Sequence, residues 1–295
     1  MLIPSISMLV TLWTILVKAS HFESISPIPA PAPNLSGDDL QEPHVLHSLQ
    51  QSGWWSGNYV YNSSYCKWPG VTCNHAGQII EIMIIGPEDS DRNGELVLQN
   101  ITLAKLNFSC LPGLLRLNMR STRLLGIIPE HIGTLSKLNT LDLSENYLTG
   151  QLPLSLANLS QLVELSLSFN QLSGCIPQEL GSKWKNLVLL DMRSNHFQGP
   201  IPLSFLSLTN LRYLLFCNNM INGSIPIEIG NLKNLKTLSL FENNLIGPLP
   251  STLFRLNKLL ELDVGSNKLS GSLPKTLGHL TNIKYLDLSS NQFSG

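Results

Sequence analysis

The sequence repeats one leucine pattern at a nearly fixed period. Seven segments, from LNTLDLSEN to IKYLDLSSN, follow L-x-x-L-x-L-x-x-N, with Ile for the first Leu in the last. Successive copies are 24 residues apart except for one step of 25, and an earlier copy, LLRLNMRST, has Thr122 in place of Asn. A repeat of this length indicates a solenoid, because one unit cannot bury its own leucines. The closing asparagines are Asn146, Asn170, Asn195, Asn219, Asn243, Asn267 and Asn291.

Each position of the repeat has a physical reason. Leu141 and Leu143 alternate with polar residues, which predicts a strand with one buried face. We expect successive strands to stack in parallel, roughly 4.8 Å apart. The Asn should turn inward and form a hydrogen-bonded ladder between coils. A glycine column should permit the following turn and a proline column should fix φ on the return path. These columns are Gly126, Gly150, Gly174, Gly199, Gly223, Gly247 and Gly271, and Pro129, Pro153, Pro177, Pro202, Pro226, Pro250 and Pro274.

The 25-residue step has a locatable cause. Between Gly174 and Gly199 the return path reads LGSKWKNL, which adds one residue and places Trp184 at the usual Leu position. We interpret it as a tolerated bulge on the convex side or flank.

The L-x-G-x-[IL]-P extension of each copy resembles plant leucine-rich repeats, as found in receptor-like kinases and receptor-like proteins, from about residue 114 to the end. Residues 66–73, CKWPGVTC, look like the N-terminal cap of that family. The resemblance implies a Cys66–Cys73 disulfide. It also implies an α/β-class solenoid, a right-handed superhelix with a parallel β-sheet on its concave face and an N-terminal cap. The segments VLHSLQQSGWW and NFSC most resemble receptor kinases that perceive peptides at the cell surface.

The cap needs apolar residues to cover the open end of the first coil. A helix is predicted from about Pro43 to Gln51, with Asp39 a candidate N-cap and Val45, Leu46 and Leu49 on one face. Trp54, Trp55 and Trp68 should add apolar area, and Ile79–Ile85 should form a first strand. The predicted domains are a signal peptide (1–20), a Pro-rich mobile segment (21–39), the cap (40–78), a degenerate first region (79–113) and about eight repeats, the last incomplete (114–295).

The N-terminus and the sequons indicate secretion. The apolar stretch 6–17 is too short to span a bilayer comfortably and is typical of a signal peptide, and no other stretch predicts a membrane span. The candidate N-glycosylation sites are Asn34, Asn62, Asn100, Asn107, Asn158 and Asn222. We therefore expect a secreted protein or one at the extracellular face of the plasma membrane.

Composition argues against several functions. The 19 Lys and Arg nearly balance 20 Asp and Glu, which disfavours nucleic acid as a partner. No kinase signature, phosphate loop or catalytic serine elbow occurs, so we predict no enzyme and no cofactor. His44 and His47 share a helix face without supporting ligands, so we predict no metal site. Cys110, Cys175 and Cys217 are interpreted as buried or free thiols.

The concave face is the expected binding surface, because every coil presents the same strand positions there. Arg120 and Arg193 could meet a carboxylate. Large aromatic and acidic residues lie beside them, and aromatic and Arg residues are common anchors of binding sites. The remaining candidates are Phe169, Tyr213, Phe241, Glu242 and Glu261.

The leading hypothesis is the ligand-recognition module of a plant receptor-like kinase or receptor-like protein in cell-surface signalling or defence. Its partner would be a peptide or protein ligand, with a co-receptor as a second candidate. The alternatives are a secreted inhibitor of pathogen wall-degrading enzymes and a non-functional truncated paralogue. The array stops inside a repeat at Gly295 without a closing cap, from which we expect a fragment with an exposed leucine core.

Overall fold

The computed structural model describes residues 43–55, 64–84, 101–273 and 275–294, and the structural statements below refer to these ranges. The predicted signal peptide, the Pro-rich segment, the Asp39 cap and the sequons Asn34, Asn62 and Asn100 lie outside them. So do Pro274, Ile85 and the middle part, residues 85–100, of the degenerate region predicted between the cap and the repeats.

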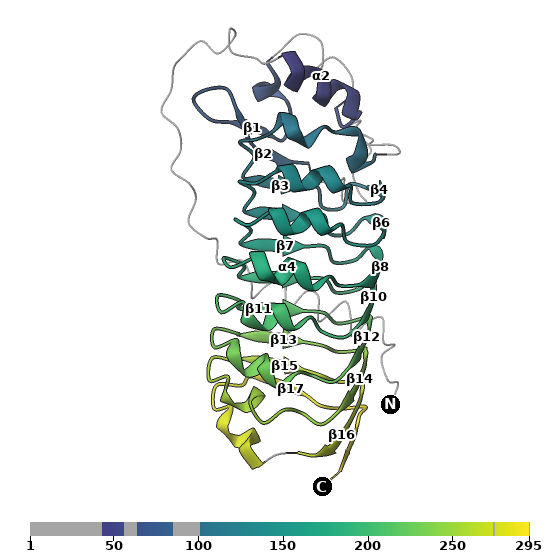
Figure 1. The fold of residues 1–295 in the computed structure, drawn as a ribbon, viewed down its shortest axis with the longest axis vertical. Coiled ribbons are helices and arrows are strands. Elements are labelled where there is room, and N and C mark those ends of the chain that lie inside the picture. The colour runs from purple at the N-terminus through teal and green to yellow at the C-terminus, as the bar shows by residue number, and fades with distance from the viewer. Residues whose placement is uncertain (1–42, 56–63, 85–100, 274, 295) are drawn as a thin grey trace, which may run out of the picture. The chain divides into compact units, whose positions relative to one another are not determined.

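One sheet runs through all the described coils (Figure 1). Its first two strands pair antiparallel, and every later neighbour pairs in parallel. The repeat pattern thus forms the predicted parallel sheet, which we call the concave sheet. In spatial order its strands are β1 (Val71–Cys73), β2 (Ile79–Met83), β3 (Arg116–Asn118), β5 (Thr140–Asp142), β7 (Glu164–Ser166), β9 (Leu189–Asp191), β11 (Tyr213–Leu215), β13 (Thr237–Ser239), β15 (Glu261–Asp263) and β17 (Tyr285–Asp287).

The leucines of the repeat form one continuous core. Leu141 pairs in register with Leu165, and Leu165 with Leu190, so the register continues across the 25-residue step. All three side chains are fully buried. Burying a Leu side chain stabilises by about 1.5–3 kcal/mol, and each coil buries its leucines only against its neighbours.

The second sheet, labelled along the right of Figure 1, is built from the L-x-G segments. Its glycines take positive φ, for example 80° at Gly150 and 84° at Gly174, a conformation that other residues reach only with strain. The predicted glycine turn is therefore present. Its parallel strands are β4 (Leu125–Gly126), β6 (Tyr147–Gly150), β8 (Gln171–Cys175), β10 (His196–Gly199), β12 (Met220–Gly223), β14 (Asn244–Gly247), β16 (Lys268–Ser272) and β18 (Gln292–Ser294).

The return path on the convex side consists mostly of 3₁₀ turns that follow the prolines. The carbonyl of Pro129 accepts from the Ile132 N–H at 3.1 Å, and that of Pro153 accepts from Leu156 at 3.1 Å. Proline is suited to this position because it needs no backbone donor there. The turns are η5 (Glu130–Thr134), η6 (Leu154–Asn158), η7 (Leu203–Ser207), η8 (Ile227–Asn231), η9 (Leu253–Arg255) and η10 (Lys275–His279).

The 25-residue step changes one of these turns. The added residue converts it into the α-helix α4 (Gln178–Lys183), visible on the convex side in Figure 1. Trp184 then fills the Leu position with its side chain fully buried. Its Nε1 donates to the Leu156 carbonyl at 3.1 Å, and its ring stacks on Phe205 at 5.9 Å. The insertion is therefore absorbed on the convex side, as predicted, without disturbing the concave sheet.

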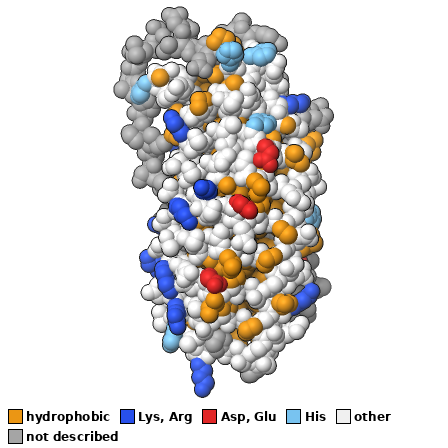
Figure 2. Space-filling model, viewed as in Figure 1, with side chains coloured by type: hydrophobic (Ala, Val, Ile, Leu, Met, Phe, Trp, Pro, Cys, Tyr) orange, Lys and Arg blue, Asp and Glu red, His pale blue; other side chains and the backbone are white. Residues whose placement is uncertain are grey.

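Charged and apolar side chains separate on the surface shown in Figure 2. Most of the Lys and Arg side chains in this view line its left side, whereas hydrophobic side chains gather toward the second sheet on the right. The exposed apolar residues of the chain include Leu154 and Ile227, which begin convex turns and are 56% and 60% exposed.

The cap covers the first coil as the sequence predicts. Helix α2 (Pro43–Ser52) buries Val45 and Leu49, with Leu46 partly buried. Trp54, Trp55 and Trp68 are also buried and lie within 6.4 Å of other aromatic rings. The turns η3 (Leu103–Lys105) and η4 (Phe108–Cys110) contact α2, which joins the cap to the repeats.

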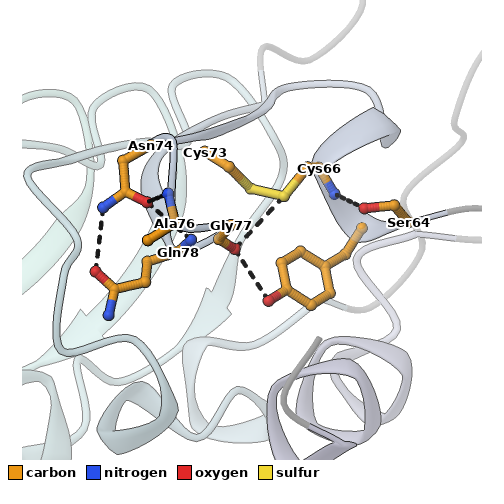
Figure 3. Close-up of a disulfide and its surroundings, with 8 residues drawn as sticks. Ser64, Cys66, Cys73, Asn74, Ala76, Gly77 and Gln78 are labelled. Carbon is orange, nitrogen blue, oxygen red and sulfur yellow. Dashed lines mark hydrogen bonds between the residues drawn. A yellow bond between two sulfur atoms is a disulfide. The ribbon is translucent and has the colours of Figure 1, made fainter. Parts of the chain in front are cut away.

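The predicted Cys66–Cys73 disulfide is present (Figure 3). It joins the turn η2 (Tyr65–Lys67) to β1, and the Tyr65 hydroxyl donates to the Gly77 carbonyl at 3.1 Å. These bonds tie the β1–β2 hairpin to the preceding chain. The other cysteines are free: Cys217 is buried, Cys110 partly buried and Cys175 exposed.

The repeat asparagines form a ladder between coils. The Nδ2 of Asn195 donates to the carbonyl oxygens of Leu167, Met192 and Arg193, and its Oδ1 accepts from the Leu172 N–H at 3.0 Å. Asn170 and Asn146 make the same set of bonds one and two coils earlier. Each Asn therefore satisfies groups of its own coil and of the coil before it. In the first coil Thr122 replaces only part of this set, donating to the Met119 carbonyl.

Candidate ligand-binding face

Every coil presents four side chains to the concave face. Two of these side chains come from the strand and two from the residues that follow it. The last of the four residues has a positive φ in each repeat, for example 54° at Phe169 and 52° at Glu242. Its N–H donates to the next coil: Phe169 to the Arg193 carbonyl at 3.0 Å and Glu242 to that of Gly265 at 3.0 Å. Because all coils share this conformation, it follows from the coil register and does not mark a binding site.

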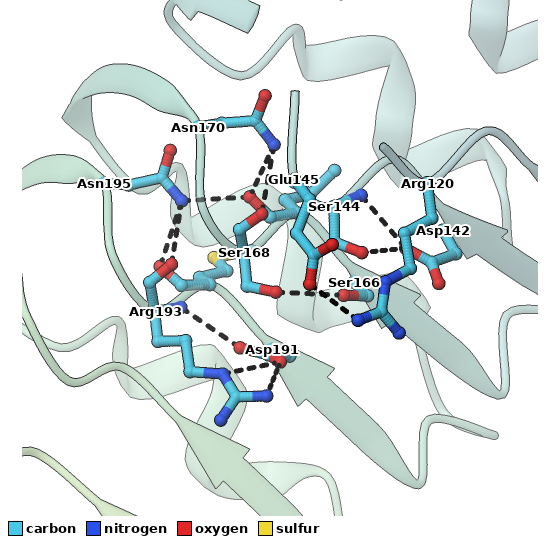
Figure 4. Close-up of polar contacts among 12 residues, drawn as sticks. Arg120, Asp142, Ser144, Glu145, Ser166, Ser168, Asn170, Asp191, Arg193 and Asn195 are labelled. Carbon is cyan, nitrogen blue, oxygen red and sulfur yellow. Dashed lines mark hydrogen bonds and ion pairs between the residues drawn. The ribbon is translucent and has the colours of Figure 1, made fainter. Parts of the chain in front are cut away.

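The first part of this face contains paired charges (Figure 4). Arg120 Nη2 donates to Glu145 Oε1 at 2.6 Å, and the Ser121 hydroxyl donates to Glu145 Oε2 at 2.6 Å. Arg116 makes two bonds to Glu81, the shorter 2.7 Å. Hydrogen bonding to these carboxylates raises the pKa of both guanidinium groups. Arg120, a predicted ligand residue, therefore has its own carboxylate within the protein.

Arg193 and Phe169 lie together on adjacent coils. The Nε and Nη2 of Arg193 donate to Asp191 Oδ2 at 3.0 and 2.9 Å, which fixes the guanidinium. Its central carbon lies 5.7 Å from the centre of the Phe169 ring, within the range of a cation–π contact. The remaining nitrogen, Nη1, is buried and has no hydrogen-bond partner among the described residues. Because Nη1 is closed to solvent, a ligand acceptor reaches it only when a neighbouring side chain moves aside.

The aromatic residues Tyr213 and Phe241 lie one and two coils beyond Arg193. Tyr213 is on β11, in register with Leu189 and Thr237, and Phe241 follows β13. Both side chains are half-buried. The structure thus orders the predicted residues along the array as Arg120, then Phe169 with Arg193, then Tyr213, Phe241, Glu242 and Glu261, and it places Phe169 against Arg193.

The last coils of the face are acidic. Glu261 accepts from the Thr237 hydroxyl at 3.2 Å, and Asp263 lies in register with Asp287 on the next strand. Burial, and then repulsion from Asp287, raises the pKa of Asp263 to about 7. Burial and the neighbouring Asp263 and Asp287 carboxylates raise the pKa of Tyr285 to about 12.

The net charge of the concave face was not apparent from the predicted residues taken one at a time. In the described part of the chain each concave Arg is paired with one acid, namely Glu81, Glu145 or Asp191. Further acids on the face have no ion pair, so the face has excess negative charge. The pairs could have been anticipated from spacing, since Asp191 is two residues from Arg193 on one strand face and Glu145 one coil beyond Arg120. The acids without an ion pair are Asp142, Glu164, Glu242, Glu261, Asp263 and Asp287.

Other predicted sites lie away from this face. The sequon asparagines Asn107, Asn158 and Asn222 are exposed, at η4, at the end of η6 and on β12. His47 hydrogen-bonds Gln51 at 2.8 Å, and the described ranges contain no group of three or more His, Cys, Asp or Glu arranged around a metal position. Within the same ranges no helix has the length and apolar character needed to cross a bilayer.

Comparisons with known proteins agree with this geometry. The family descriptions "Leucine-rich repeat region" and "Leucine rich repeat" match residues 168–294 and 100–172. The leucine-rich repeat receptor-like serine/threonine-protein kinase RGI4 of Arabidopsis thaliana is 35% identical over 112 residues, which are 38% of this chain and 8% of the kinase. The alignment therefore spans only a small part of that relative.

Solved structures are similar over more of the chain. The ectodomain of the Arabidopsis thaliana receptor kinase GASSHO1/SCHENGEN3, solved with CASPARIAN STRIP INTEGRITY FACTOR 2, has a TM-score of 0.74 and 30% identity, over 85% of this chain and 30% of that one. The plant peptide hormone receptor RGFR1 in complex with RGF2 has a TM-score of 0.59 and 35% identity, over 63% and 30%. With its repeat pattern, two-sheet coils and disulfide-bonded cap, the chain belongs to the leucine-rich-repeat proteins, and its array is similar to the ectodomains of plant receptor kinases.

Proposed function

We propose that this chain is an extracellular recognition module that binds a peptide on its concave face. The observation that carries the proposal is the fixed guanidinium of Arg193. Asp191 orients it, Phe169 covers one side, and its buried Nη1 has no partner among the described residues. A peptide carbonyl would supply the missing acceptor once a neighbouring side chain moves aside to admit it, and a buried donor without an acceptor is costly.

The neighbouring coils suit the rest of such a ligand. Tyr213 and Phe241 offer apolar surface with few rotatable bonds, which is typical of binding anchors. Glu242, Glu261 and Asp263 beyond them would attract cationic groups. We therefore infer a peptide with an apolar side chain near Phe241 and a Lys, Arg or free amino group toward β15.

The relatives support this class of ligand. Solved structures with 30% or more identity include RGFR1 with RGF2, GASSHO1/SCHENGEN3 with CASPARIAN STRIP INTEGRITY FACTOR 2, and HAESA with an IDA peptide hormone. By analogy we place this chain outside the cell, in cell-surface signalling. A co-receptor partner and the absence of catalytic activity stay predictions.

The test is selection of binders from a displayed library of random peptides against the secreted chain. Recovered peptides should be enriched in Lys or Arg, and Arg193→Ala combined with Phe241→Ala should weaken their binding at least tenfold. A control pair, Lys67→Ala with Leu203→Ala, changes an exposed cation and an exposed apolar residue away from the face. Equal affinity of the selected peptides for both pairs of variants would refute the proposal.

A further inference from the structure

The loops that lead from the convex turns back to the concave strands have an unusual charge composition. Five consecutive loops, residues 184–188, 208–212, 232–236, 256–260 and 280–284, contain no Asp or Glu. They contain six of the 19 Lys and Arg of a nearly neutral chain. We call this surface the basic flank, and its cations are Lys185, Arg212, Lys233, Lys236, Lys258 and Lys284.

These cations are available to a partner. Five are exposed and Lys236 is half-buried. None has an ion pair in the described part of the chain, whereas the three concave arginines all have one. Lys258 Nζ donates to the neutral Asn234 Oδ1 at 2.7 Å and keeps its charge uncompensated. Unpaired like charges on adjacent coils repel one another, so an anion bound there would relieve that repulsion.

The flank is also linear. Neighbouring strands of a sheet are roughly 4.8 Å apart, and the backbone continues this stacking into the loops, where the Lys236 N–H donates to the Arg212 carbonyl at 2.8 Å. The positive charges therefore form a row along the array, on the side away from the second sheet (Figures 1 and 2). A row of charges matches an extended polyanion better than a compact one.

Asparagine side chains on the same loops indicate that the ligand carries hydroxyl groups. Asn210 Nδ2 donates to the Lys185 carbonyl at 2.9 Å, and Asn282 Nδ2 donates to that of Asn257 at 2.6 Å. Both side chains are exposed, and these bonds leave each Oδ1 as an oriented acceptor. A sugar hydroxyl can donate to it, whereas a phosphate diester has no donor to offer. The five loops also present no exposed large apolar residue, which disfavours a protein partner.

We propose that the basic flank binds a linear carboxylated polysaccharide. Lysines would attract its carboxylates, and the fixed asparagine amides would accept from its hydroxyls. Of the described sequons, Asn222 lies on β12 of the second sheet and Asn107 at the cap, whereas Asn158 ends η6, one coil before the first loop of the flank. The site is separate from the concave face, so peptide binding and polysaccharide binding can succeed or fail independently.

The test measures binding of the secreted chain to de-esterified polygalacturonate, at about 0.05 M and about 0.5 M salt. The substitutions Lys236→Gln, Lys258→Gln and Lys284→Gln together should weaken binding at low salt about tenfold, since each exposed ion pair contributes modestly. The matched control removes the same charge elsewhere, through Lys67→Gln, Lys105→Gln and Lys268→Gln, and should change binding less than twofold. High salt should abolish the interaction.

Two further polymers decide what is recognised. Methyl-esterified polygalacturonate has no free carboxylates and should not bind. Inorganic polyphosphate has charge without hydroxyl donors and should bind more weakly than polygalacturonate. Equal loss in the flank and control variants, equal binding of the methyl ester, or stronger binding of polyphosphate would each overturn the proposal.

Discussion

The asparagine ladder permits a quantitative prediction at Asn195. Its amide is almost fully buried and makes four hydrogen bonds. In Asn195→Ala the three carbonyls that accept from Nδ2 keep another donor each. Leu167 O still accepts from Asn170 Nδ2 at 3.1 Å and Met192 O from Asn219 Nδ2 at 3.0 Å, while the third accepts from the Phe169 N–H at 3.0 Å.

The Leu172 N–H is different, because its acceptor at 3.0 Å is Asn195 Oδ1 and that atom is removed. An unsatisfied buried N–H costs about 1–3 kcal/mol. We therefore expect Asn195→Ala to lower the free energy of unfolding by about 2 kcal/mol, which in an array of this size lowers Tm by about 4–8 °C.

Asn195→Asp separates the roles of the two amide atoms. One carboxylate oxygen can still accept from Leu172, but the other faces three carbonyl oxygens without a proton to donate. The introduced group should therefore have a folded-state pKa above its unfolded value of about 3.9. The Asn195→Asp variant should therefore be most stable at low pH. Its free energy of unfolding should fall as the pH rises from about 4 through the folded-state pKa of the new carboxyl. At pH 7 it should be less stable than Asn195→Ala.

The assay is thermal unfolding followed by circular dichroism at pH 4 and pH 7. Asn186→Ala serves as the control, because Asn186 is exposed on a loop between α4 and β9. The reasoning is wrong if Asn195→Ala unfolds within about 1 °C of Asn186→Ala, or if Asn195→Asp matches the wild-type Tm at pH 7.

Three further predictions concern packing, charge and the cap. Gly230→Ala should destabilise the fold by about 1–3 kcal/mol in a denaturant titration, because the new Cβ would lie 2.6 Å from Thr252 Cβ. In the control Gly278→Ala the new Cβ meets no atom within 4 Å, so the free energy of unfolding should not change. The pKa of Asp263 is about 7 when folded and about 3.9 when unfolded, so this group should lower wild-type stability by at most about 4 kcal/mol as pH rises from about 4 to about 7. Asp263→Asn should reduce the slope in melts across that range and leave the part that the buried carboxyls of Asp191 and Glu164 contribute through their own raised pKa. Replacing Cys66 and Cys73 by Ser should cost about 2.5 kcal/mol by the loop-entropy estimate, and an unchanged urea midpoint would contradict it.

Most of the fold could be predicted because each repeat position has a local cause. Alternating leucines give a strand with one buried face, and Gly150 marks a turn that needs positive φ. The cap helix was predicted from Val45 and Leu49, and its observed end differs by one residue from the predicted one. The β1–β2 hairpin and the second sheet were not predicted, because both depend on hydrogen bonds between separate segments.

The candidate site was less predictable. The sequence placed Arg120 and Arg193 on the concave face, where the structure has them, but it could not show that each has an acid of its own. Whether a side chain is free for a ligand depends on its neighbours in other coils, and these neighbours cannot be identified from the sequence of one strand.

The sequence by itself determined the architecture, since a fixed period of leucines, asparagines, glycines and prolines repeats one local conformation in every coil. Only the tertiary structure decided how the charges are distributed. Stacking brings residues about 24 positions apart to within contact distance, as with Thr237 and Glu261. It pairs the concave arginines, leaves the concave acids in excess and lines up six cations along one flank. These features arise when stacked coils bring side chains at equivalent positions close together, because electrostatic interactions depend on distance in space and not on position in the chain.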